Sequence, residues 1–141
     1  MLRIFLIKLG CKSFQESVFI TPYNPRELLN KFIKLNNIPG MIIASDMGEN
    51  GGIGEITLID MLAKIYNLKN INEKYNLFLD KVRKSKPNSL ILLEYLSILK
   101  DDPQLPFNLL PNWWLGNKAH QKYEKIKLFY DASGRAGDRK I

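Results

Sequence analysis

The apolar positions in the first part of the chain change between helical and extended spacing. Residues 2–9 carry leucine and phenylalanine at three- and four-residue intervals and Gly10 follows, which predicts an amphipathic helix ending at the glycine. Residues 17–21, SVFIT, are rich in β-branched and aromatic side chains and stop at Pro22, so they predict a short strand. The apolar run MIIA at 41–44 predicts a second strand.

A helix start is the clearest local signal between these two strands. Asn24 suits the cap position, Pro25 suits the first helical position, and Glu27 stands three residues after the cap. Because the sequence NNIPG at 36–40 combines turn-forming residues, we expect the helix to end there.

A polar, glycine-rich loop, SDMGENGGIG, occupies residues 45–54. Its glycines match neither the P-loop nor the dinucleotide-binding fingerprint, so a turn is the simpler interpretation than a phosphate site. Asp46 and Glu49 offer carboxylates for a divalent cation, but without the spacing of an EF-hand. We therefore expect no bound metal and no cofactor.

Helical spacing dominates the next part of the chain. Apolar positions predict a helix over 55–68 and, after a break at Asn70–Asn72, a second one through Val82, with the aromatic residues in the core. Residues 85–88 then combine charge, proline and asparagine at the end of a basic cluster. We place a domain boundary at this linker.

Beyond the linker we expect two helices separated by an irregular segment. Ser89 is expected to cap a helix over 90–99, whose sequence LILLEYL predicts burial on more than one face. Prolines prevent a continuous helix over 103–111, where neighbouring tryptophans supply packing area. The last helix is expected over 119–130, with basic residues outside. These residues are Lys118, Lys122, Lys125 and Lys127.

Composition narrows the class of protein. The chain of 141 residues is 45% hydrophobic and 25% charged, which is typical of a folded globular protein. Its 21 Lys and Arg against 14 Asp and Glu give a net charge of +7. This excess fits either dispersed solubilising charge or a nucleic-acid surface. Because the N-terminal apolar stretch is too short for a signal peptide or a membrane span, we expect a soluble, cytoplasmic protein with no membrane partner.

Catalytic and metal-binding patterns are missing from the sequence. The chain has one cysteine, Cys11, and one histidine, His120, which excludes a disulfide scaffold and a zinc module with four Cys or His ligands. No GxSxG motif accompanies His120, and Cys11 has no second cysteine as a redox partner. We expect both residues to have packing or surface roles, and nothing in the spacing indicates an enzyme.

The stretch DDPQLPFNLLPNWWLGNKA, residues 101–119, resembles the signature of the PaaX-type transcriptional regulators, known as repressors of phenylacetate catabolism. That signature combines Asp-Pro, Leu-Pro, Leu-Leu-Pro and Trp-x-Gly. The matching residues are Asp102, Pro103, Leu105, Pro106, Leu109, Leu110, Pro111, Trp114, Gly116 and Ala119.

Two upstream stretches are similar to further segments of the same family. They are LGCKSFQESVFITP at 9–22 and IYNLKNINEKYNLFL at 65–79. The residues that match are Gly10, Val18, Ile20, Pro22, Tyr66, Leu68, Tyr75, Phe78 and Leu79. The resemblance thus covers about residues 1–130.

This resemblance implies an architecture. Family members have an N-terminal winged helix that binds DNA, a ferredoxin-like middle domain akin to the small CRISPR-associated adaptation nuclease, and a C-terminal helical region. On this basis we expect an α+β fold. An incomplete ferredoxin-like domain would occupy 1–84, the linker 85–88, a small helical domain 89–130 and a disordered tail 131–141. The uncapped helix at Met1 leads us to expect a truncated chain that lacks the winged helix.

The leading hypothesis is a fragment of a PaaX-like repressor that keeps the dimerisation and effector-response regions. The resemblance implies a homodimer and an acyl-CoA effector such as phenylacetyl-CoA, with DNA bound only through the missing winged helix. Two alternatives stay open. One is a metal-dependent nuclease using Asp46 and Glu49. The other is a stand-alone module that pairs through an exposed sheet edge.

Overall fold

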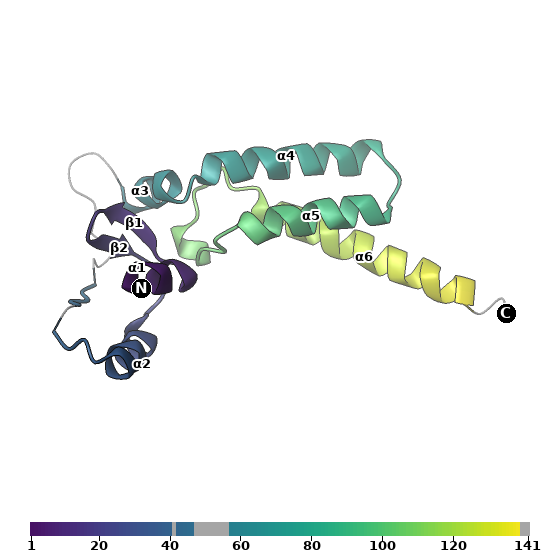
Figure 1. Cartoon of the computed structure of the whole chain (residues 1–141). Coiled ribbons are helices and arrows are strands. Elements are labelled where there is room, and N and C mark those ends of the chain that lie inside the picture. The colour runs from purple at the N-terminus through teal and green to yellow at the C-terminus, as the bar shows by residue number, and fades with distance from the viewer. Residues whose placement is uncertain (41, 47–56, 139–141) are drawn as a thin grey trace. The chain divides into compact units, whose positions relative to one another are not determined.

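A computed structural model of the chain describes residues 1–40, 42–46 and 57–138 (Figure 1). The chain divides into two compact units. Unit 1 consists of Met1–Tyr66 and Leu105–Leu109, and unit 2 of Asn67–Gln104 and Leu110–Ile141. The described residues are mostly helical and include one two-stranded sheet, so the expected α+β class is confirmed.

Unit 1 opens with a helix and a β-hairpin. Helix α1 (Leu2–Lys8) ends before Gly10, which has the positive φ of +85° that glycine tolerates best. Strands β1 (Lys12–Gln15) and β2 (Val18–Ile20) pair antiparallel, with a bulge on β1. Strand β2 confirms the expectation at 17–21. Strand β1 was not predicted, because three of its four residues, KSFQ, are polar, and all four are exposed in the structure.

Helix α2 (Arg26–Asn36) follows the hairpin and differs from its expected start. Pro25 takes the cap position, and the Asn24 side-chain oxygen accepts the Arg26 N–H at 3.2 Å. Glu27 does not fold back on the cap, because its carboxylate pairs with Lys31 at 3.0 Å. The helix ends as expected, at Asn37 in the left-handed conformation. Aromatic stacking of Phe5 on Phe32, with centroids 4.2 Å apart, holds α1 and α2 together.

The strand expected at 41–44 is wrong for the part that the structure describes. Residues 42–44 form no strand, and Ile43 is 95% exposed. An isolated apolar run of this length has no neighbouring strand to satisfy its backbone N–H and C=O groups. Met41 and residues 47–56, which include most of the glycine-rich loop, lie outside the described residues.

Helix α3 (Leu58–Ile65) closes the first part of unit 1. The Thr57 hydroxyl caps it by accepting the Asp60 N–H at 3.1 Å. The chain breaks at Asn67, which has a φ of 52°, and not at Asn70–Asn72, which lie inside the next helix. The short helix η1 (Phe107–Leu109) packs against α3. Side chains buried in this unit are Cys11, Leu29, Leu62, Ala63, Tyr66 and Leu105.

Unit 2 is built from helices α4 (Leu68–Lys84), α5 (Ser89–Asp101) and α6 (Gly116–Asp138), each in contact with the other two (Figure 1). Asn88, rather than Ser89, caps α5 by accepting the Ile91 N–H at 3.0 Å. The buried residues of this unit are Leu68, Ile71, Tyr75, Phe78, Leu79, Ile91, Tyr95, Ile98, Pro111, Gly116, Ala119 and Ile126.

Two boundaries in unit 2 differ from the expected ones. Residues 85–88, expected as an interdomain linker, join α4 to α5 within one unit because these two helices share a core. Helix α6 continues to Asp138, past residue 131 where we expected a disordered tail to begin. No proline interrupts this stretch, so a helix already started by packing can propagate through it.

Helix α6 starts beneath the indole ring of Trp114. Gly116 is buried, and a Cβ atom at this position would meet the indole, lying 2.7 Å from its Cε2 atom. The same indole meets the Tyr75 ring edge-on, with centroids 5.5 Å apart and planes at 88°. Residue 116 must therefore be glycine for the indole to reach Tyr75, which gives the Trp-x-Gly spacing a physical reason.

We expect Gly116→Ala to destabilise the protein. The added methyl group would push the indole away from Tyr75, at a cost of about 1–3 kcal/mol typical of overpacking. Urea unfolding followed by circular dichroism measures the change. Gly134→Ala in the same helix is the control, because a Cβ there meets nothing within 4 Å. This control should lose no stability, since alanine favours helix over glycine by about 1 kcal/mol. Equal stability of the two variants would contradict this account of Gly116.

Candidate functional site

The residues that carry the family-like signature fall in both units. Leu105, Pro106 and Leu109 belong to unit 1, where Leu105 is buried and the other two are half-buried. Pro22, from the upstream match, is half-buried two residues after the end of β2. In unit 2, Pro111 and Gly116 are buried. Pro103, Leu110 and Trp114 are half-buried there.

The signature's aspartate joins the end of α5 to α4. The hydroxyl of Tyr75, whose side chain is fully buried, donates to Asp102 Oδ2 at 2.6 Å. The other carboxylate oxygen accepts the N–H of Gln104 at 2.8 Å. Burial, reinforced by the hydrogen bond and charge of Asp102, raises the pKa of Tyr75 well above its ordinary value. The phenol therefore remains a hydrogen-bond donor at every physiological pH.

A second polar contact fixes the start of α6. The Leu115 N–H donates to Asn72 Oδ1 at 2.7 Å. Backbone N–H groups at a helix start have no partner within the helix, and here α4 supplies one. Asn72 and Tyr75 thus hold the two ends of the signature segment from one face of α4.

Tyr95 occupies the centre of a second aromatic group. Its ring stacks on Tyr123 with centroids 4.3 Å apart, and its hydroxyl lies 3.0 Å from His120 Nδ1. Burial, with a smaller contribution from Asp102, raises the pKa of Tyr95 to about 12. His120 is exposed and contacts Tyr95, so the expected packing or surface role is confirmed.

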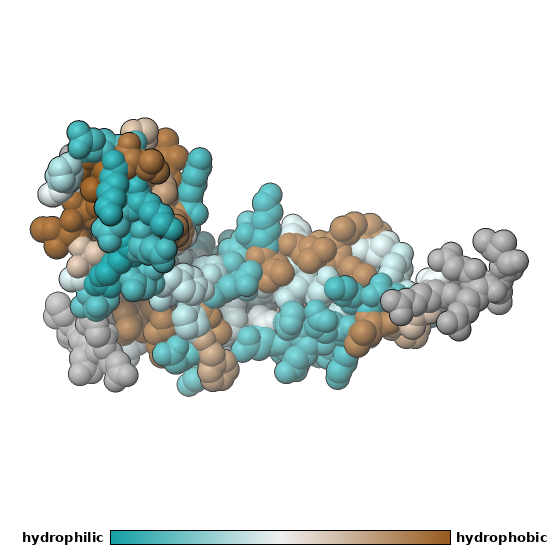
Figure 2. All heavy atoms as spheres, turned by 90° about the horizontal axis from the view of Figure 1, so that it is seen from below, coloured by the Kyte–Doolittle hydropathy of each residue, from teal (hydrophilic) through white to brown (hydrophobic). Residues whose placement is uncertain are grey.

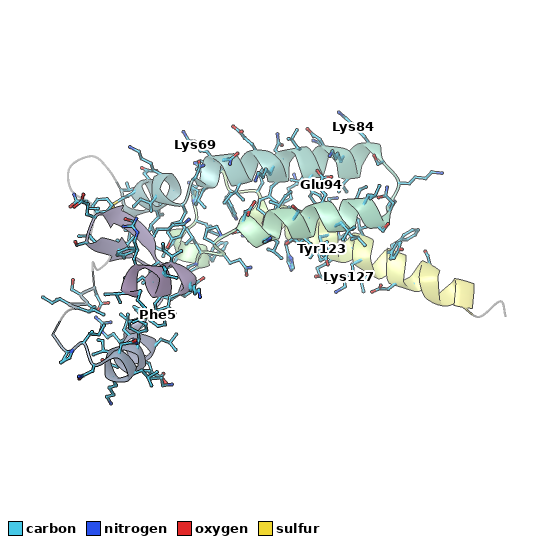
Figure 3. The ribbon with its side chains drawn as sticks, in the orientation of Figure 1. Phe5, Lys69, Lys84, Glu94, Tyr123 and Lys127 are labelled. Atoms are coloured by element: carbon cyan, nitrogen blue, oxygen red, sulfur yellow. The ribbon has the colours of Figure 1, made fainter. Side chains whose placement is uncertain are left out.

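Ion pairs line the α4–α5 contact. Glu94 projects from α5 toward α4 (Figure 3), where Lys81 Nζ lies 2.8 Å from its carboxylate. Lys74 Nζ lies 3.2 Å from Asp101. These pairs are partly exposed, so each contributes little energy and mainly favours one alignment of the two helices.

No catalytic or metal-binding arrangement is found within the described residues. None of their His, Cys, Asp and Glu side chains gather in groups of three that suit a metal ion. Asp46, proposed for the nuclease alternative, is exposed and pairs with Arg26 at 3.3 Å, and Glu49 lies outside the described residues. Cys11 is buried, and burial raises the pKa of its thiol.

Sequence reasoning missed the role of Asn72, although a signal for it exists. Asn72 stands four residues after Leu68 and three before Tyr75, so it shares the face of α4 that these buried residues define. A polar residue on such a face indicates a hydrogen bond to a neighbouring element. The sequence alone does not show which backbone N–H donates to Asn72.

We expect Tyr75→Phe to cost more stability than Tyr95→Phe. The first variant removes a hydrogen bond to a carboxylate, worth about 1.5–3 kcal/mol, and the second removes a bond to the ring nitrogen of His120, in the ordinary range of about 0.5–1.5 kcal/mol. Urea unfolding at neutral pH measures both, and each serves as the other's control because both delete one buried phenol oxygen. If Tyr95→Phe proved the more damaging, Asp102 would not be the anchor that its geometry indicates.

Comparison with known proteins identifies the family of the chain. The model of the PaaX-like protein C-terminal domain matches residues 66–136, which include α4, α5 and the signature segment and make up half of the chain. The curated proteins contain no match, and neither do the solved structures. Over the described residues, no helix combines the length and apolar character needed to cross a membrane. Because the family model matches half of the chain, the chain belongs to the family of PaaX-like proteins, whose members are transcriptional regulators.

Proposed function

We propose that this chain provides the self-association and effector-response part of a PaaX-like transcriptional repressor. In such a repressor, the resemblance assigns DNA recognition to an N-terminal winged helix, which the described residues do not form. It also assigns relief of repression to an acyl-CoA effector. The observation that carries the proposal is a row of exposed leucines on α5 of the family's C-terminal domain.

Helix α5 has two apolar faces, one buried against the rest of unit 2 and one exposed to solvent. Ile91, Tyr95 and Ile98 are buried against the other helices of unit 2, whereas Leu90, Leu93 and Leu96 are 74%, 60% and 44% exposed. Apolar side chains also show among the polar ones on the lower side of the helical unit (Figure 2). A continuous exposed apolar row on a folded domain is typical of a protein interface. The sequence predicts that α5 is buried on more than one face, and in this proposal a partner covers the face that carries the exposed leucines.

The spacing of this row suits a second copy of the same helix. The leucines stand at i−3, i and i+3 around Leu93, so an antiparallel α5 pair would place Leu93 near the two-fold axis. Leu90 of each copy would then face Leu96 of the other. This self-complementary arrangement supports a homodimer as the assembled form.

Unit 1 supports the assignment to the ferredoxin-like middle domain of the family. Its elements α1, β1, β2 and α2 follow the order helix, strand, strand, helix found inside the β-α-β-β-α-β fold. A two-stranded sheet is marginal by itself. No other strand among the described residues pairs with the outer edges of β1 and β2. We propose that these edges receive further strands in the assembled regulator, either from the same chain or from a second one.

We expect replacement of the three α5 leucines by glutamine to abolish self-association. Burying one leucine contributes about 1.5–3 kcal/mol, so each replacement should weaken the dimer about tenfold or more. Sedimentation equilibrium over a range of protein concentrations measures the dissociation constant.

Leu77→Gln on α4 provides the matched control for this experiment. Leu77 is 59% exposed, but every position three or four residues away from it is charged, so it forms no apolar row. This variant should dimerise like the unmodified chain. A monomeric unmodified chain, or a triple variant that still dimerises normally, would refute the proposed surface.

A further inference from the structure

We propose that one face of α6, formed by Lys118, Lys122 and Lys125, binds the phosphate backbone of duplex DNA. These lysines stand at i, i+4 and i+7, so they share one side of the helix. Lys118 and Lys125 are exposed, and Lys122 is half-buried. We call this set the lysine face. Its proposed role is separate from self-association through α5.

Among the described residues, no carboxylate forms an ion pair with the lysine face. Every position three or four residues away from these lysines within the chain is uncharged or is another member of the set. Over the part of the chain that the structure describes, none of the three takes part in an ion pair. On α4, by contrast, Lys74, Lys81 and Arg83 each pair with a carboxylate.

The fourth lysine of the helix, Lys127, which is labelled in Figure 3, lies on a different side of α6 from the lysine face. Glu124 stands three residues before Lys127 and Asp131 four residues after it, so these two acids share its side of α6. Glu124 is adjacent in sequence to Lys125 and therefore points to a different side. Helix α6 consequently has one purely cationic face and one mixed face.

The dimensions of the lysine face fit a DNA strand. Seven residues of α-helix span about 10 Å, and one DNA strand carries a phosphate about every 3.4 Å along the axis. Three lysines over this length match about three successive phosphates. Contacts of this type read no bases, so they add affinity and orientation to a regulator whose sequence recognition lies elsewhere.

The test is binding of a fluorescein-labelled duplex of arbitrary sequence, followed by anisotropy between about 50 and 200 mM salt. Each lost phosphate contact lowers the slope of log affinity against log salt by about 0.9, so K118Q/K122Q/K125Q should lower it by about 2–3. Affinity at the lowest salt should fall at least tenfold. Circular dichroism and sedimentation confirm that fold and self-association are unchanged.

Two controls separate the lysine face from net charge. K8Q/K34Q/K64Q removes the same charge from exposed lysines on three other helices, and K127Q removes one charge from the mixed face of α6. The first should leave the slope nearly unchanged, and the second should cost less affinity than K125Q. Equal loss in the two triple variants, no duplex binding at the lowest salt, or stronger binding to polyglutamate than to DNA would each overturn the proposal.

Discussion

The arrangement of unit 2 depends on the buried ring of Tyr75. Its hydroxyl donates to Asp102 at the end of α5, its ring lies nearly perpendicular to that of Trp114 before α6, and its centroid is 6.1 Å from that of Tyr95. One side chain of α4 therefore contacts both flanking segments. A buried phenol is suited to this position because it combines a large apolar surface with one donor that must find a partner.

The contacts of Tyr75 explain why the signature at 101–119 combines an aspartate, prolines, a tryptophan and a glycine. Asp102 accepts a hydrogen bond from the Tyr75 hydroxyl, and Gly116 leaves room for the Trp114 indole. Pro111, which lies between these two residues in the sequence, is buried. Each residue serves a packing or hydrogen-bonding need of one small region. The signature thus describes how α5 and α6 are joined, and by itself it identifies no ligand.

The sequence predicted most helices of the chain, because their apolar spacing is regular, but it misplaced the boundaries set by single side chains. Asn67 rather than Asn70 breaks the chain, since only the former takes a left-handed conformation. Strand β1 escaped prediction because pairing with β2, not apolar character, determines it. The family signature was found from sequence, whereas Asn72 was missed because its partner is a backbone N–H 43 residues away.

Three helices that share one core still have outer faces free for other purposes, and in unit 2 these faces differ in chemistry. Helix α4 is charged on its outside, and three of its cations, Lys74, Lys81 and Arg83, pair with neighbouring carboxylates. Helix α5 exposes leucines, and α6 exposes lysines without partners among the described residues. Leaving apolar area exposed costs solubility, and leaving cations unpaired forgoes stabilising interactions. Both features are what the two proposals require, since a second copy would cover the leucines of α5 and DNA phosphates would pair with the lysines of α6.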